Sequence, residues 1–169
     1  MEIKMVLHLP RDAASVPVSR QVLDSCLETL GVVPDTRADI ALALSEACAN
    51  VILHAGPGEE YQVQVRARNR RCAIEVVNTG SGDAGSVPDG NGTGPAWGGG
   101  ARASAIAVTD DPVPVTAEHG RGLKIIDAVA DNLRLTGNER QGTIVHFEKT
   151  LEWLPGAAGQ HLFNADSGG

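Results

Sequence analysis

Hydrophobic and polar residues follow two different periodicities in the first third of the chain. Residues 3–9 alternate with a period of two, which predicts a strand with one buried face. Apolar residues recur every three or four positions in 15–30 and again in 34–54, and this spacing predicts two amphipathic helices. Gly31 follows the first helix and a Gly-Pro-Gly sequence at 56–58 follows the second, and both signal helix termination. The pattern predicts a strand followed by two consecutive helices.

Strand-like alternation returns in the middle of the chain and near its end. Residues 61–67 and 72–77 alternate on either side of a short turn, which predicts a β-hairpin. Residues 122–130 show helical spacing again, and 132–136 and 143–150 read as two final strands. The chain contains no internal repeat, so these elements are expected to share one core.

Residues 79–119 differ in composition from the rest of the chain. They are rich in Gly, Pro, Ser, Asp and Ala and have little periodicity, so they cannot bury enough apolar surface to order themselves. A loop of this length within a compact domain is usually functional or mobile. We therefore expect a single domain over 1–154 with a long flexible lid at about 79–119, followed by a disordered tail over 155–169.

Composition and charge narrow the classes of function. The 169 residues suffice for one domain with a real core, and an aromatic content of 3% means that aliphatic residues must fill it. The formal net charge of -7 argues against nucleic acid as a direct partner but leaves a basic protein partner open. Solubility alone is the simpler explanation of that charge.

The cysteines and the apolar runs bear on the compartment. Cys26, Cys48 and Cys72 are odd in number, lack metal-ligand spacing, and are expected to be small buried hydrophobes in a reducing environment. No signal-peptide pattern and no apolar run of membrane-spanning length is present. We expect a cytoplasmic protein with no membrane contact.

The second predicted helix carries three polar residues four positions apart, Glu46, Asn50 and His54. Residues with this spacing lie along one side of a helix. A Glu–Asn pair at the edge of a buried face can hold a hydrated cation, and Mg²⁺ suits hard oxygen ligands and retained waters. His54 is better explained by interaction with the helix dipole. The apolar stripe beside these residues is formed by Ile40, Leu44, Ala47, Val51 and Ala55.

Two glycine pairs stand at the ends of predicted elements. Gly80 and Gly82 follow Asn78 at the end of a strand, and Gly120 and Gly122 precede a helix. Glycine lets the backbone approach a ligand closely, and a helix start offers unpaired N–H groups to phosphate. Either pair alone is most simply a turn, and neither a Walker-type P-loop nor a strand-linked Rossmann fingerprint is present.

The order of these features resembles the Bergerat-fold (GHKL) ATPases, the superfamily that includes gyrase, the heat-shock chaperone ATPase, histidine kinases and mismatch-repair ATPases. Within it the chain looks most like the small anti-sigma-factor serine kinases of bacteria. The resemblance runs from Ile3 to about Leu151. Ser45–Asn50 with His54-Ala55 matches the N-box of these kinases, 120–126 the second glycine box, and 142–147 the closing strand motif. The implied fold is an α/β (α+β) two-layer sandwich with a mixed, mostly antiparallel sheet and helices on one face.

The resemblance also implies roles for individual residues. Asn50 would ligate Mg²⁺ that bridges the phosphates of ATP, and Glu46 would be the catalytic general base. Thr143 would lie close to the adenine. The remaining nucleotide-binding positions implied by the glycine boxes are Asn78, Gly80, Gly82, Gly120, Arg121, Gly122 and Leu123.

Asn78 departs from the family pattern, which has Asp at the start of the first glycine box. A carboxamide oxygen can still accept a hydrogen bond from the adenine amino group, but it carries no charge. Because charge-assisted hydrogen bonds are stronger, adenine binding should weaken by about 1 kcal/mol.

Two functions follow as hypotheses. The first is an ATP- and Mg²⁺-dependent serine/threonine protein kinase that phosphorylates a small antagonist protein and binds a sigma factor, thereby regulating transcription. The alternative is a non-catalytic nucleotide-binding module that acts by protein association, which Asn78 and the long lid favour. Relatives commonly dimerise, so a homodimer is open under either hypothesis.

Overall fold

A computed structural model describes residues 1–54, 59–79, 117–138 and 142–164 of the chain. Within these ranges, no helix combines the length and the apolar character that crossing a membrane requires. In chain order the elements are β1 (Glu2–Pro10), α1 (Ser15–Leu30), α2 (Pro34–His54), β2 (Glu60–Arg68), β3 (Arg71–Thr79), α3 (Ala117–Val129), β4 (Asn132–Asn138), β5 (Gly142–Thr150) and α4 (Ala158–Asn164).

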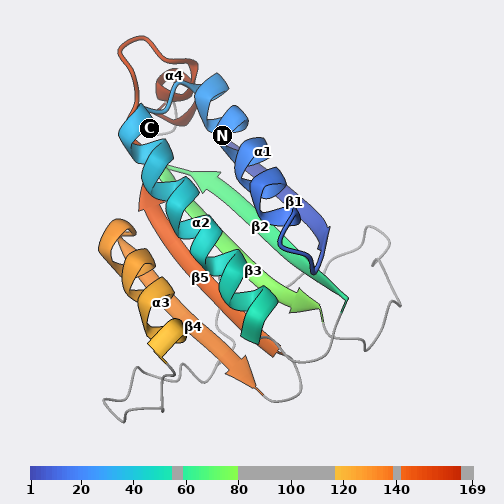
Figure 1. Ribbon diagram of the computed structural model, residues 1–169. Coiled ribbons are helices and arrows are strands. Elements are labelled where there is room, and N and C mark those ends of the chain that lie inside the picture. The colour runs from blue at the N-terminus through green and yellow to red at the C-terminus, as the bar shows by residue number, and fades with distance from the viewer. Residues whose placement is uncertain (55–58, 80–116, 139–141, 165–169) are drawn as a thin grey trace.

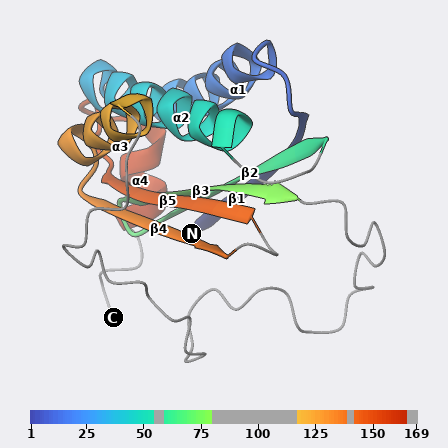
Figure 2. The ribbon, with the colours of Figure 1, turned by 60° about the horizontal axis from the view of Figure 1, so that its bottom comes forward.

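The strands form one five-stranded sheet in the order β1-β2-β3-β5-β4. Helices α1, α2 and α3 cover one face of it, and no helix of the described ranges covers the other face (Figure 1, Figure 2). The predicted two-layer α+β sandwich is confirmed. All pairings between the described strands are antiparallel, so the expected mixed character of the sheet is not seen there.

The hairpin of β2 and β3 shows how local sequence sets the register of the sheet. Asn69 and Arg70 form its turn with φ angles of 48° and 62°, and Arg68 pairs with Arg71 across it. Positive φ at both central residues matches the twist of the flanking strands. The register that follows directs the even-numbered residues of β3 from 72 to 78 toward the helices, and all of them are buried.

The core lies between the sheet and α2. The stripe predicted for this helix is confirmed for Ile40, Leu44, Ala47 and Val51, which are all buried, whereas Ala55 lies outside the described residues. Tyr61 of β2 is buried as well, and its hydroxyl is 2.7 Å from Ser15 Oγ. Apolar burial on this scale is the main favourable term in folding.

The apolar face of α1 is narrower than its sequence spacing suggests. Leu23 and Leu27 are buried, but Val22 and Cys26 are exposed, because α1 packs against α2 and β1 rather than over the centre of the sheet. The expectation of a buried Cys26 is therefore wrong. Burial of the other two thiols is confirmed, and it raises the pKa of Cys48 to about 11 and that of Cys72 to about 12.

The chain beyond Pro155 contains a helix, contrary to the expected disordered tail. Helix α4 lies at the end of the molecule where α1 meets α2 (Figure 1). Phe163 is buried and stacks on Trp153 with ring centroids 5.5 Å apart. The segment before α4 is also fixed, since Leu154 N–H donates to the carbonyl of Gly31 at 2.8 Å. This packing supplies order that the tail's own composition does not predict.

Candidate functional site

The predicted site residues lie on elements that meet at one end of the sheet. The second half of α2, the start of α3, the end of β3 and the start of β5 all lie toward this end, opposite α4 (Figure 1). These elements are far apart in sequence, and α2 packs directly against α3, β3 and β5. The fold therefore gathers the N-box, the second glycine box and the closing strand in one region.

Helix α2 holds Glu46 and Asn50 at the border of its buried stripe. Both side chains are half-buried, and the neighbouring Ala47 and Val51 are fully buried against the sheet. Because the stripe fixes the rotation of the helix, the two polar side chains lie along one side of α2 as the spacing predicts. His54 ends α2, and its side chain lies outside the part of the chain that the structure describes.

Helix α3 meets Glu46 at Gly122. A Cβ atom at position 122 would lie 2.9 Å from Glu46 Oε2, which is closer than side-chain carbons approach other atoms. The contact depends on the packing of α3, whose Ile126 is buried in the core and whose Leu123 packs against it. The structure thus brings together the carboxylate of one motif and the backbone of another.

The second glycine box lies inside α3, not in a loop that precedes it. The helix begins at Ala117, so Gly120 is in its first turn and Gly122 in its second. Only N–H groups of the first turn lack an acceptor within a helix, and the N–H of Gly122 is therefore paired within α3. The expected helix start at Gly122 is wrong for this reason. Arg121 is exposed to solvent.

Asn78 lies at the end of β3 on the face that the helices cover. Its side chain is only 3% exposed, and it continues the row of buried residues in this strand. Next to it, Val77 pairs with Ile144 of β5, which places Thr143 near the same end of the sheet. Gly80, Gly82 and residues 80–116 of the expected lid lie outside the described residues. The ends of the lid, expected at 79–119, belong to regular elements instead, because residue 79 is the last of β3 and residues 117–119 begin α3.

Lys149 fixes the far end of α3. Its Nζ donates to Asp39 Oδ2 of α2 at 2.7 Å and to the carbonyl oxygen of Val129 at 2.6 Å. One ammonium group thereby joins β5, α2 and the last residue of α3. The motifs in the sequence assign no role to Lys149. One feature of the sequence could have indicated a role: Lys149 occupies the same face of β5 as the buried Val145 and Phe147, where a charged residue is unusual.

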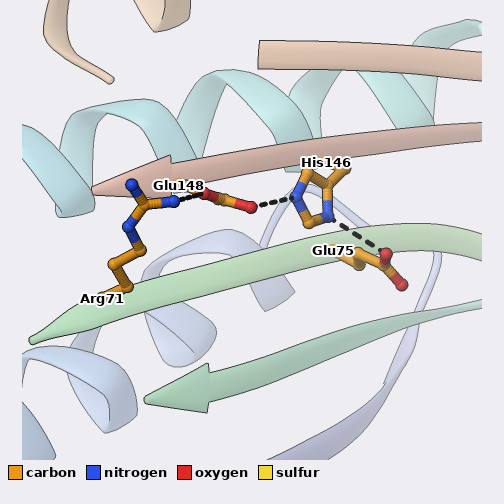
Figure 3. A network of polar contacts seen from close by, with 4 residues as sticks. All are labelled: Arg71, Glu75, His146 and Glu148. Carbon is orange, nitrogen blue, oxygen red and sulfur yellow. Dashed lines mark hydrogen bonds and ion pairs between the residues drawn. The ribbon is translucent and has the colours of Figure 1, made fainter. Parts of the chain in front are cut away.

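A second polar cluster lies on the uncovered face of the sheet. Figure 3 shows His146 between two carboxylates, with Nδ1 3.0 Å from Glu75 and Nε2 3.3 Å from Glu148, and Arg71 Nη1 3.3 Å from Glu148. The hydrogen bond to Glu75, more than the one to Glu148, raises the pKa of His146, although burial opposes it. Since the sheet separates this cluster from α2, it does not join the candidate site.

The donor set on α2 suits a hydrated metal ion held in part by a ligand. In the part of the chain that the structure describes, no three His, Cys, Asp or Glu residues converge on one point that could hold a metal. A metal site built from these four residue types alone is therefore absent from those ranges. The amide oxygen of Asn50 and the carboxylate of Glu46 are hard donors, and Mg²⁺ commonly takes one or two such groups together with phosphate oxygens and waters.

Comparison with family models gives a match over most of the chain. The family described as the histidine kinase-like ATPase domain matches residues 9–149, which include both candidate motifs on α2 and α3. Comparison with curated protein sequences gave no significant match.

Comparison with solved structures gives a match to the crystal structure of the RsbU and RsbW domains of Rv1364c from Mycobacterium tuberculosis. The TM-score is 0.59 at 16% sequence identity, and the similarity covers 88% of this chain. It covers 32% of the mycobacterial chain, so the present chain spans about a third of that protein's length. At this identity the match supports the fold.

Proposed function

The chain belongs to the histidine kinase-like ATPase (GHKL) family, and from this premise we propose that it is an anti-sigma-factor-like serine/threonine protein kinase. Membership in the family implies ATP binding. Beyond that, we propose that the protein uses Mg²⁺, transfers the γ-phosphoryl group of ATP to a Ser or Thr of a small antagonist protein, and binds a sigma factor.

One observation carries the proposal: the close approach of Gly122 to Glu46. A hypothetical Cβ at position 122 lies 2.9 Å from Glu46 Oε2, so the acidic residue of the N-box lies directly against the second glycine box. Asn50 is one helical turn further along α2, and the buried Asn78 is near the end of β3. The ends of these two elements lie toward the same end of the sheet (Figure 1). A kinase site needs a proton acceptor, a metal ligand and phosphate-binding amides close together. We assign the first two to Glu46 and Asn50, and the amides to the first turn of α3 near Gly120.

We propose the following division of roles. Glu46 accepts the proton of the seryl or threonyl hydroxyl as general base, and Asn50 holds the Mg²⁺ ion. ATP supplies the phosphoryl group when it is bound. Amides in the first turn of α3 near Gly120, together with the exposed Arg121, meet the phosphates, and Thr143 lies close to the adenine. Phosphoryl transfer of this kind depends chiefly on positioning and charge neutralisation.

A phosphoryl-transfer assay tests the kinase proposal. The protein is incubated with γ-labelled ATP, Mg²⁺ and candidate antagonist proteins, and label on Ser or Thr is measured. Glu46→Gln should lower kcat by about 100-fold or more, since positioned general bases contribute about 10² to 10⁴. Glu152→Gln, an exposed glutamate at the opposite end, is the matched control and should leave kcat unchanged. Transfer that is equal in wild type and Glu46→Gln would remove Glu46 from the mechanism.

Sigma-factor and antagonist binding are proposed from the resemblance of the motifs, with a cytoplasmic location. The charge of -7 is compatible with a basic protein partner. Purified sigma factors and antagonist candidates from the source organism can be tested by analytical size exclusion with and without ATP. Co-elution with at least one sigma factor supports the proposal, and the same runs report whether the protein is a homodimer. Absence of any complex would restrict the function to nucleotide chemistry.

Asn78 favours a second candidate function, a non-catalytic module that acts by protein association. It replaces the family's Asp at a position that is buried on the site side of the sheet, so the charge that would strengthen adenine recognition is missing. Calorimetric titration with ATP and Mg²⁺ distinguishes the two functions. A nucleotide that binds the native state must also raise the unfolding temperature by mass action. Neither heat nor stabilisation at millimolar ATP would favour the non-catalytic module.

A further inference from the structure

Gly122 is a poor residue for its position in α3. Helix interiors favour alanine over glycine, because glycine loses more backbone freedom on folding. Among the described glycines, Gly31 and Gly156 have positive φ, and Gly122 does not. Backbone conformation therefore gives no reason for glycine at this position, and the reason must lie in the space beside it.

That space is occupied by the end of the Glu46 side chain. A Cβ at position 122 would lie 2.9 Å from Oε2 of Glu46 and 3.9 Å from its Cδ and Cβ. The nearest atom is the tip of a flexible side chain, so the carboxylate would move to another rotamer and the two helices would stay together. A side chain at position 122 would thus displace the carboxylate of Glu46 at a cost in rotamer energy, but it would not separate the two helices.

We propose that Gly122 is a positioning residue for Glu46: its missing side chain lets the carboxylate lie against α3, in the place where it meets the acceptor hydroxyl. The catalytic part of this inference rests on the proposed kinase function. The resemblance assigns the second glycine box to phosphate binding, but the N–H of Gly122 is paired within the helix. The side of its Cα from which a side chain would project faces Glu46. Displacement of a catalytic group by about 1 Å can lower a rate about 100-fold.

The variant Gly122→Ala separates positioning from nucleotide binding. We expect kcat for phosphoryl transfer to fall about 100-fold, with the KM for ATP and the Kd for ADP nearly unchanged. The unfolding temperature should stay the same or rise, since alanine suits the helix better. Ala128→Gly, at an exposed position of the same helix, is the control: it should lower the unfolding temperature and leave kcat unchanged. A large rise in the Kd for ADP in Gly122→Ala would overturn the proposal.

A double-mutant cycle tests the contact itself, independently of activity. Removal of the carboxylate by Glu46→Ala also removes the obstacle, so Gly122→Ala should raise the unfolding temperature more in the Glu46→Ala background than in wild type. Equal shifts in both backgrounds would show that the two residues do not interact and would overturn the proposal. If wild type transfers no phosphate to any acceptor, the kinase function fails, whereas the cycle still decides whether Gly122 positions Glu46.

Discussion

Truncation of Phe163 should destabilise the whole domain, although this residue lies in a tail that the sequence predicts to be disordered. Phe163 is 2% exposed and stacks on Trp153 at 5.5 Å with an interplanar angle of 16°. Phe→Ala substitutions in cores cost about 3–5 kcal/mol. Because Trp153 is itself partly exposed and can collapse into the space, we expect about 3 kcal/mol for Phe163→Ala.

Urea unfolding followed by tryptophan fluorescence measures this cost. A loss of about 3 kcal/mol corresponds to a fall of about 6–12 °C in Tm for a chain of this size. Leu162→Ala, on the neighbouring residue of α4 at 43% exposure, should change the free energy of unfolding by less than about 1 kcal/mol. If Phe163→Ala stays within about 0.5 kcal/mol of wild type, α4 is not docked and the reasoning from its packing is refuted.

Three further predictions follow from single residues. Asn78→Asp should tighten ATP binding about fivefold through a charge-assisted hydrogen bond, and it should lower the stability of the nucleotide-free protein because a charge is buried. Calorimetry measures both effects, and an unchanged affinity for ATP would show that residue 78 does not contact the adenine. Native protein treated with iodoacetamide at pH 8 should be alkylated quickly at the exposed Cys26 only, because burial raises the pKa of Cys48 to about 11 and that of Cys72 to about 12. Mass spectrometry of the digested protein identifies the alkylated cysteine. The pKa of His146 is raised in the folded protein, so its contribution to stability is fully present below about pH 6.5 and is lost as the pH rises through the folded-state pKa. His146→Gln should therefore flatten the dependence of the free energy of unfolding on pH in this window.

The elements of the fold are largely predictable because their signals are local. Residues 15–30 and 34–54 carry helical spacing with clear termination signals, and the structure has helices with these bounds. The alternating strands from 61 to 77 are confirmed with their turn at Asn69 and Arg70. Spacing of this kind reflects burial on one face, which is a property of the sequence itself.

The remaining features depend on contacts that no local pattern contains. Helix α4 has only seven residues, too few to be stable alone, and the stacking of Phe163 on Trp153 stabilises it. The sequence pattern misplaces the start of α3, because the glycines at 120 and 122 resemble a helix boundary. Both lie inside the helix, and Gly122 lies against Glu46 of the neighbouring helix. The packing of α2 against α3 brings Glu46 next to Gly122, and the proposed roles of Glu46 and Asn50 stay predictions.

The order of strands in the sheet has a consequence for synthesis of the protein. β5 is synthesised after β3 and β4 and pairs with both of them, so it fills an interior position of the sheet. Until residues 142–150 emerge, β3 presents an unpaired edge rich in β-branched residues, and β4 has no strand beside it. A nascent chain stalled before this point is exposed to aggregation, and the native sheet forms only after residues 142–150 have emerged.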